Sequence, residues 1–299
     1  NLYSSDFYTA IASKFPFNKK IIFTRRMASS KIDTAKNLNI VKFIFKSFDL
    51  HISCSASVDR AFQILLKNVG IETNQVNTAV IENGVLVPDE HFFINVATRA
   101  KHGFNIPEDS FVIAHVGRME VGKSDTSGSL TSSPKAHDVI LKTFAQVQKN
   151  HKNTVLLLIG DGFLRKELEL LAHKLGIQQY VRFAGALSQP WEALAIANLF
   201  FFPSRYEGLP NALIEAACAG LPAVVSDIAE IKNVHHGQAW RVAKVDDELA
   251  FTDQIQKAIS EYAVLSVQAQ QDAEIYNEKY SISACAENYR RCFEQVYHQ

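Results

Sequence analysis

From residue 111 onward, short apolar runs alternate with longer stretches in which apolar and polar residues recur at helical spacing. The apolar runs predict strands at 111–116, 155–159, 181–183, 199–202, 223–226 and 239–242. The stretches between them predict helices at 137–149, 163–175, 189–197, 211–219 and 246–263. Strands that alternate with helices in this way are typical of a parallel, doubly wound α/β sheet.

The first part of the chain shows the same alternation. It predicts helices at 6–15, 36–48 and 58–68, and strands at 20–24, 49–53 and 78–82. Two arginines, Arg25 and Arg26, follow the first strand; they suit either an anionic ligand or a solvated turn, and we give them no firm role. Residues 86–108 interrupt the pattern with Pro88 and Pro107, so we place a domain boundary there. The predicted domains are residues 1–106 and 107–280, and residues 281–299 form a final helix.

Residues 124–134, with the sequence SDTSGSLTSSP, break the alternation in the second domain. They have no apolar periodicity and many serines, threonines and glycines, which is typical of a flexible loop. We interpret the segment as an insertion between Gly122-Lys123 and the helix that follows Lys135.

The composition and the apolar runs argue against several classes of function. The 31 lysines and arginines balance the 31 aspartates and glutamates, so no overall field attracts nucleic acid. No apolar run approaches the roughly 20 residues that a membrane span requires, and no secretory signal is visible. The four cysteines form no CxxC pair, which favours reduced thiols and a cytoplasmic location. Lysines beside the apolar stripe of residues 36–48 suit a membrane surface, but a helix with one face in the core is the favoured interpretation.

Two glutamates flank one turn between a strand and a helix. Glu207 lies in the polar turn after residues 199–202, and Glu215 lies on the helix that follows. A strand, a turn and a helix N-terminus place backbone N–H groups at the carboxyl edge of a sheet, where open α/β sheets bind phosphate-bearing ligands. A single glutamate at such a place is often only a helix-start charge, whereas two around one turn are much less common.

The same stretch carries a family resemblance. Tyr-Glu-Gly-Leu-Pro at 206–210, Glu-Ala-Ala at 215–217 and Ala-Gly-Leu-Pro-Ala-Val at 219–224 resemble the donor-sugar signature of retaining glycosyltransferases of family four. The resemblance covers most of the chain and is strongest from about residue 111 to 230. It implies the GT-B fold, which has two Rossmann-like doubly wound domains that face a cleft, with the final helix packed back toward the N-terminal domain. Residues 1–106 hold only about half of such an N-terminal domain, so we expect it to be incomplete.

The resemblance also implies roles for individual residues. Arg118 and a lysine would stabilise the leaving diphosphate, and Glu207 and Glu215 would accept hydrogen bonds from sugar and ribose hydroxyls. For the lysine, Lys135 at the helix start is favoured over Lys123, which keeps the family's offset from the arginine. The catalytic set is then Arg118, Lys135 and Glu207. The donor-binding set is Gly117, Lys123, Arg182, Phe183, Gly185, Ser204, Tyr206, Gly208, Leu209, Pro210, Asn211 and Glu215.

No metal and no cofactor are expected, because no Asp-x-Asp pair occurs in the chain. Four histidines, His115, His137, His235 and His236, are available as bases, although a lone histidine is more often structural. The predicted function is metal-independent, retaining transfer from a UDP- or GDP-sugar to a glycan or lipid-linked acceptor. The setting would be polysaccharide or lipopolysaccharide synthesis, with peripheral contact with the cytosolic membrane face. The alternatives are an inactive nucleotide-sugar-binding fragment and a GT-B epimerase or phosphorylase.

Overall fold

The fold is described from a computed structural model of the chain, which covers residues 20, 22–25, 38–89, 92–93, 101–122 and 129–297. The predicted helix at 6–15, Arg26 and Lys123 lie outside these residues. The chain divides into two compact units, one of Asn1–Gly84 with Ile282–Gln299 and one of Val85–Ser281. This division falls before the boundary that the sequence predicts at residue 106. None of the helices in the described ranges is long and apolar enough to cross a membrane.

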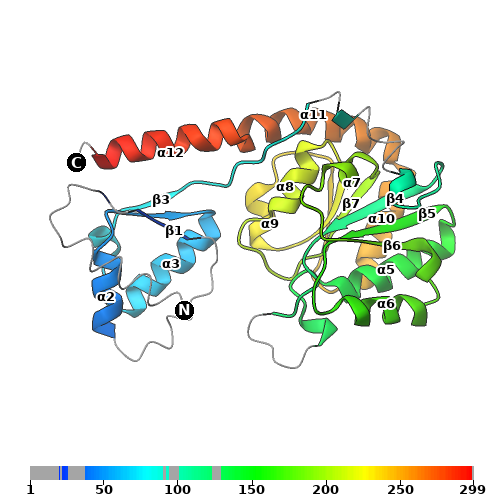
Figure 1. Cartoon of the computed structure of the whole chain (residues 1–299), viewed down its shortest axis with the longest axis horizontal. Helices are drawn as coiled ribbons and strands as arrows, with labels where there is room; N and C mark the ends of the chain where they lie inside the picture. The colour runs from blue at the N-terminus through cyan, green and yellow to red at the C-terminus, as the bar shows by residue number, and fades with distance from the viewer. Residues whose placement is uncertain are drawn as a thin grey trace. The chain divides into compact units, whose positions relative to one another are not determined.

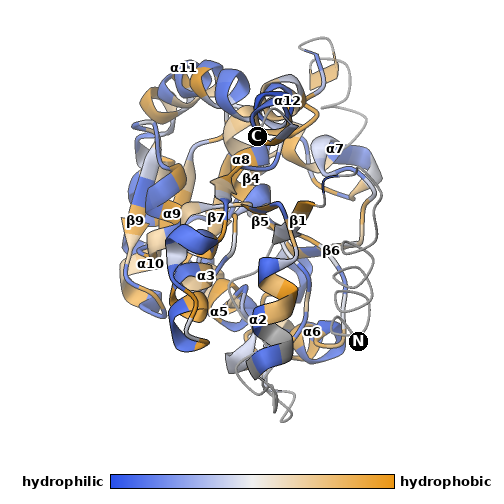
Figure 2. Cartoon of the chain, turned by 90° about the vertical axis from the view of Figure 1, so that its left-hand side faces the viewer, coloured by the Kyte–Doolittle hydropathy of each residue, from blue (hydrophilic) through white to orange (hydrophobic). Residues whose placement is uncertain are grey.

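The first unit is built on a parallel sheet in the order β1-β2-β3, with β1 at Ile22–Arg25, β2 at Leu50–Ser53 and β3 at Thr78–Val80. Side chains of β2 alternate between the two faces of the sheet. His51 packs among the rings of Phe45 and Phe62, which belong to helices α2 (Leu38–Lys46) and α3 (Ala56–Asn68). Apolar and polar residues are interleaved along both helices, as one-sided packing requires (Figure 2).

The other face of β2 meets the end of the chain. Leu50 and Ile52 form a buried cluster with Val296 of helix α12 (Ile282–Tyr297), and Cys285 and Cys292 of the same helix pack against that cluster. All four cysteines lie in the described part of the chain, and all are free thiols.

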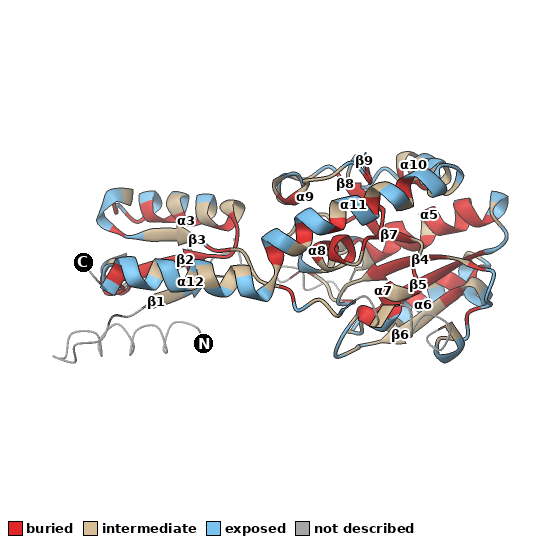
Figure 3. Ribbon diagram, turned by 90° about the horizontal axis from the view of Figure 1, so that it is seen from above, coloured by how far each residue is buried: buried red, intermediate tan, exposed pale blue. Residues whose placement is uncertain are grey.

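The second unit is built on a six-stranded sheet in the order β6-β5-β4-β7-β8-β9, and every strand pair is parallel. The strands are β4 at Phe111–Val116, β5 at Thr154–Ile159, β6 at Val181–Gly185, β7 at Leu199–Phe202, β8 at Ala223–Ser226 and β9 at Trp240–Ala243. Strands β4, β5 and β7 are almost wholly buried (Figure 3), which is why they are continuous apolar runs. The predicted doubly wound sheet is confirmed.

The order of the strands reverses between β4 and β7. The chain runs outward from β4 through β5 to β6, then returns to β7 and runs outward the other way. Helices α5 (His137–Asn150), α6 (Arg165–Lys174) and α10 (Glu248–Ser260) lie on one side of the sheet (Figure 1). Helix α8 (Asn211–Cys218) packs on the other side, with α11 (Tyr262–Tyr280) against it. Segments that follow β4 and β7 therefore meet at the switch point, where open sheets bind ligands.

In the described ranges, two helices were not predicted, α11 and the short α9 at Ala229–Val234. Helix α11 buries one face, but Val264, Val267 and Ile275 are exposed on the rest of its surface, so its apolar residues taken together form almost no one-sided stripe. The available signal was the absence of glycine and proline from 262–280, together with many alanines, glutamines and glutamates, which favour helices. The predicted helix at 246–263 corresponds to α10, which ends at Ser260. Its last predicted residues belong to α11, which begins at Tyr262.

The predicted insertion is described only in part. From Ser129 the chain forms a short 3-10 turn at Leu130–Ser132, capped by the Ser129 hydroxyl, which accepts from Thr131 N–H. The Gly122 N–H donates to the Ser132 carbonyl at 3.1 Å. Gly122 and Ser132, which flank residues 123–131 in the chain, are therefore hydrogen-bonded neighbours.

Candidate active site

The candidate site begins at the turn that joins β7 to α8. Strand β7 is fully buried and ends at Phe202, and the polar turn that follows ends at Pro210. Pro210 is the N-terminal cap of α8, where its missing N–H costs nothing because that group would have no intrahelical partner. Its carbonyl accepts from Leu213 and Ile214, which starts the helix. The turn thus places Glu207 before a helix N-terminus and Glu215 within the helix.

Glu207 forms an ion pair with Lys135. The Lys135 Nζ lies 2.6 Å from Glu207 Oε1, and the two side chains are 23% and 8% exposed. The same ammonium lies 5.0 Å from the centre of the Phe202 ring, over its face. Lys135 comes from the segment before α5, and Glu207 comes from the turn after β7. The structure therefore brings two predicted catalytic residues together from opposite sides of the switch point.

Glu215 lies in a different environment. It makes no hydrogen bond or ion pair with its side chain within the described ranges, and burial raises the pKa of its carboxyl from 4.5 to about 7. An unpaired carboxylate in such surroundings loses its hydration without compensation, which favours the protonated form. Ligand hydroxyl groups that donate to this carboxylate would offset the loss of hydration.

Gly117 and Arg118 follow β4 and pack against the glycines that follow β5. The Gly117 N–H donates to the Ile159 carbonyl, and a Cβ on Gly160 would lie only 2.0 Å from the Gly117 carbonyl oxygen. Gly160 has φ +136, so a side chain there would be strained as well as crowded. A Cβ on Gly162 would likewise lie 2.4 Å from the Met119 carbonyl oxygen, so backbone packing requires both glycines of the Gly160-Asp161-Gly162 run. Arg118 itself is exposed and makes no ion pair with the described residues.

Tyr206 lies beside Gly122. It is 52% exposed, and its Oη lies 3.0 Å from the position that a Cβ on Gly122 would occupy. Partial burial, and then the charge of Glu207, raise the pKa of its hydroxyl. Tyr206 is therefore a neutral hydroxyl at the rim of the Lys135–Glu207 pair.

Two buried histidines lie behind the pair. The His115 Nδ1 lies 2.9 Å from the Phe201 carbonyl, and the His137 Nδ1 lies 3.1 Å from the Ser133 hydroxyl. Burial lowers the pKa of His115 well below 6.5 and that of His137 to about 4. Both rings are therefore neutral near pH 7 and pack edge to face, 5.1 Å apart. They are wholly buried, as structural histidines are.

The remaining donor residues of the turn are described in part by burial and backbone contacts. Ser204 is buried, and its carbonyl accepts from the Ser226 hydroxyl of β8. Leu209 is buried, Gly208 is half-buried, and Asn211 is exposed at the first turn of α8. This arrangement leaves Gly208 and Asn211 accessible, while Ser204 and Leu209 anchor the turn.

Of the three predicted donor-binding residues in β6, two lie near the carboxyl edge and one does not. Phe183 packs against the core and under the Arg165 guanidinium, and Gly185 ends β6 with φ +74. Arg182 donates instead to the carbonyls of Asn105 and Gln179, which precede β4 and β6 at the amino edge of the sheet. The structure does not bring the Arg182 guanidinium to the other predicted residues.

The sequence predicted no catalytic or binding role for Arg205. In the structure its side chain contacts Ser133, Asp138 and Asp246. These residues are far apart in the chain, and no periodic pattern connects them. The one signal was its place between Ser204 and Tyr206 in the glutamate motif.

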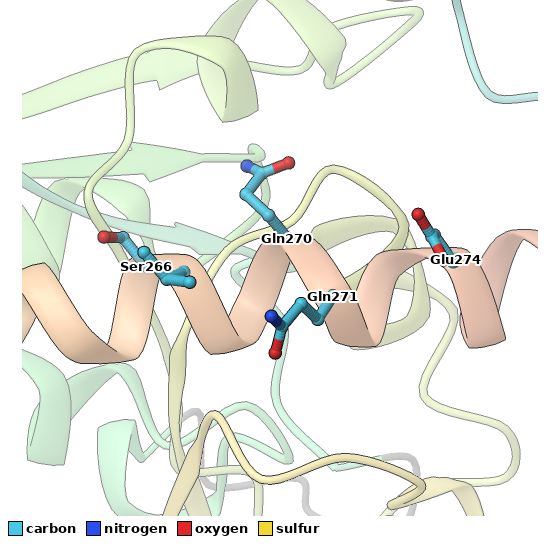
Figure 4. A pocket seen from close by; sticks show the side chains of 5 residues that line it. Ser266, Gln270, Gln271 and Glu274 are labelled. Carbon is cyan, nitrogen blue, oxygen red and sulfur yellow. The ribbon is translucent and has the colours of Figure 1, made fainter.

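A shallow hollow lies elsewhere, along the outer side of α11 (Figure 4). It is lined by Ser266, Val267, Gln270, Gln271 and Glu274, all from that one helix. Glu274 is its single ionisable residue, so the hollow offers no set of groups for group transfer.

Part of the second unit matches a known protein family. Residues 126–261 match the family described as Glycosyl transferases group 1. An uncharacterized glycosyltransferase of Methanocaldococcus jannaschii is 33% identical over 123 residues, which are 41% of this chain and 27% of that protein. The putative glycosyltransferase EpsF of Bacillus subtilis is 32% identical over 131 residues, 44% of this chain and 31% of that protein. The chain thus matches less than a third of the length of these relatives.

Solved structures extend the likeness to nearly the whole chain. Anabaena HepE, in complex with UDP and glucose, has a TM-score of 0.76 at 18% identity, over 98% of this chain and 76% of that one. WaaG, described as a glycosyltransferase involved in lipopolysaccharide biosynthesis, has a TM-score of 0.69 at 19% identity, over 91% of this chain and 75% of that one. The fold is the GT-B fold that the sequence resemblance implies.

Proposed function

Because residues 126–261 match the family of group 1 glycosyltransferases, we propose that the chain transfers a sugar from a nucleotide-sugar donor to a glycan or lipid-linked acceptor. The observation that carries the proposal is the Lys135–Glu207 pair at the switch point of the second sheet. HepE was crystallised with UDP and glucose, and LpsD of Rhizobium meliloti is named for lipopolysaccharide core biosynthesis. We therefore propose polysaccharide or lipopolysaccharide synthesis as the setting.

The pair suits both halves of a sugar donor. Cleavage of the glycosyl–phosphate bond places negative charge on the leaving diphosphate, and a cation held nearby stabilises that charge. The Lys135 ammonium has three donors and gives one to Glu207, so two remain for phosphate oxygens. The exposed guanidinium of Arg118 would supply a planar fork for the same group. Glu207 would accept from sugar hydroxyls beside them.

Glu215 completes the donor site in this proposal. Its carboxylate would accept hydrogen bonds from the ribose, and those donors would replace the hydration that burial removes. Retention of the anomeric configuration and independence of a metal are parts of the same proposal. The chain has no Asp-x-Asp pair to hold a divalent ion on the diphosphate. Contact with the cytosolic membrane face would follow from a lipid-linked acceptor.

A donor-turnover assay tests the proposal. The 299-residue chain would be incubated with UDP- and GDP-sugars, with and without a chelator, and the release of UDP or GDP measured. Glu207→Gln should reduce the release by at least tenfold, because an amide accepts hydrogen bonds from sugar hydroxyls less strongly than a carboxylate. Glu278→Gln, at an exposed position on α11, is the matched control and should leave the rate unchanged.

Two outcomes would overturn it. If no nucleotide sugar binds, the chain is not a donor-dependent transferase. If a nucleotide sugar binds and is not turned over with any glycan or lipid acceptor, the chain is a nucleotide-sugar-binding protein, which was the alternative that the sequence left open.

A further inference from the structure

Arg205 connects three segments that meet around the Lys135–Glu207 pair. It lies in the turn after β7, and its side chain is only 15% exposed. Its Nη1 donates to the Ser133 carbonyl at 2.8 Å, and its Nη2 donates to both carboxylate oxygens of Asp138, at 3.0 and 3.2 Å. Its Nε donates to Asp246 at 2.8 Å. Every nitrogen of the guanidinium is therefore engaged.

These contacts surround Lys135 along the chain. Ser133 precedes it by two residues, and Asp138 follows it by three. The backbone N–H of Arg205 adds a fourth link, since it donates to the Pro134 carbonyl at 2.8 Å. Arg205 therefore binds the segment on both sides of Lys135, while Glu207, two residues from Arg205, binds the ammonium of Lys135 itself.

The network also holds backbone in an unfavourable conformation. Ala136 and Asp246 have φ of +52 and +61, and they are two of the three non-glycine residues with positive φ in the described ranges. Ala136 directly follows Lys135, and Asp246 is bound by Arg205. A left-handed residue persists only where its surroundings impose it, and such residues often occur at functional sites.

We propose that Arg205 is a positioning residue, which fixes the segment 133–138 so that the Lys135 ammonium stays beside Glu207 and meets the donor diphosphate. This inference rests on the function proposed above. Lysine cannot replace arginine here, because a single ammonium cannot reach Ser133, Asp138 and Asp246 in the directions of the guanidinium fork. Asp138 would retain only the more distant Lys142, 3.9 Å away.

The test combines ligand binding with local hydrogen exchange. Binding of UDP and of GDP would be measured calorimetrically for the wild-type chain, Arg205→Lys, Lys135→Ala and the double variant. If Arg205 acts through Lys135, Arg205→Lys weakens binding about five- to tenfold in the wild-type background and less than twofold in the Lys135→Ala background. Amides of 133–138 should exchange at least tenfold faster in Arg205→Lys, while those of β5 should not change.

Arg241→Lys is the matched control, because Arg241 is also a partly buried arginine in an ion pair, with Glu261 at 2.8 Å. It should change neither the binding nor the exchange of 133–138. Equal losses in both backgrounds, or unchanged exchange of 133–138, would overturn the positioning role. If the wild-type chain binds neither UDP nor GDP, the proposed function fails, and the exchange data alone decide whether Arg205 holds the segment of Lys135.

Discussion

The turn Pro203–Pro210 and helix α8 are adjacent in the chain, yet they hold their glutamates in opposite ways. In the turn, Glu207 already has a partner, and the backbone around it is bound to the segment before α5. On α8, Glu215 has no side-chain partner among the described residues, and its carboxyl has a pKa of about 7. One carboxylate has its partner before a ligand arrives, whereas the other is half protonated near pH 7 until a ligand compensates its charge.

The difference has a physical reason. A turn at a switch point is reached by segments from the other half of the sheet, so a lysine before α5 can approach it. Helix α8 instead buries one side, including Leu213, Ile214 and Cys218, and Glu215 lies at the edge of that apolar face. The paired region should therefore control the reaction rate, and the unpaired region should control the dependence on pH.

The largest expected effect is on the paired region. Lys135→Ala should reduce turnover about 10²- to 10³-fold, the usual loss when one group that stabilises transition-state charge is removed. Lys123→Ala should change turnover less than twofold, because the ammonium of Lys135 already occupies the place beside Glu207. Steady-state rates of UDP or GDP release would measure both. A larger loss for Lys123→Ala would show that Lys123, and not Lys135, stabilises the leaving diphosphate. The ion pair of Glu207 would then not explain the rate.

The next effect concerns stability on the unpaired side. Because folding raises the pKa of Glu215 from 4.5 to about 7, the folded protein takes up a proton between these values and loses stability as pH rises through them. Glu215→Gln removes this loss. It should raise the free energy of unfolding by about 3 kcal/mol at pH 8, since one pKa unit corresponds to about 1.4 kcal/mol, and by almost nothing at pH 4.

Urea unfolding at the two pH values would measure the change, with Glu278→Gln as the exposed control. An equal effect of Glu215→Gln at pH 4 and pH 8 would show that folding does not shift the pKa of Glu215. The contrast between Glu215 and Glu207 would then fail.

Nucleotide binding should depend on pH through the same group. Ribose hydroxyls donate to a carboxylate, so binding favours the ionised form of Glu215. With a pKa of about 7, roughly one tenth of the groups are ionised at pH 6 and nine tenths at pH 8. The dissociation constant for UDP or GDP should therefore rise about tenfold from pH 8 to pH 6, and this change should disappear in Glu215→Gln. A slope that persists in the variant would assign the titration to another group.

The same contrast shows what the sequence could predict. The strands and their parallel, doubly wound sheet were predictable because buried parallel strands are apolar runs, and the glutamate motif lies in one continuous stretch. Lys135 could be favoured because it begins a predicted helix. The contacts of Arg205 were not predictable, since Ser133 and Asp138 lie 72 and 67 positions away, and only the fold brings them to it. Helix α11 was missed because its apolar residues follow no single stripe.

The smallest effect is on backbone strain beside the pair. Ala136 is buried at φ +52, and a left-handed alanine costs about 1 kcal/mol or more. Ala136→Gly removes that strain but also a buried methyl, worth about 0.8 kcal/mol, so the net gain in unfolding free energy should be about 0.5 kcal/mol.

Ala145→Gly, in the interior of α5, should lose about 1 to 2 kcal/mol, because glycine is a poor helix former. Urea unfolding would measure both variants: the free energy of unfolding should rise in Ala136→Gly and fall in Ala145→Gly. If Ala136→Gly destabilises the chain as much as Ala145→Gly does, the segment that carries Lys135 holds no strain, and its fixed position depends on the contacts of Arg205 alone.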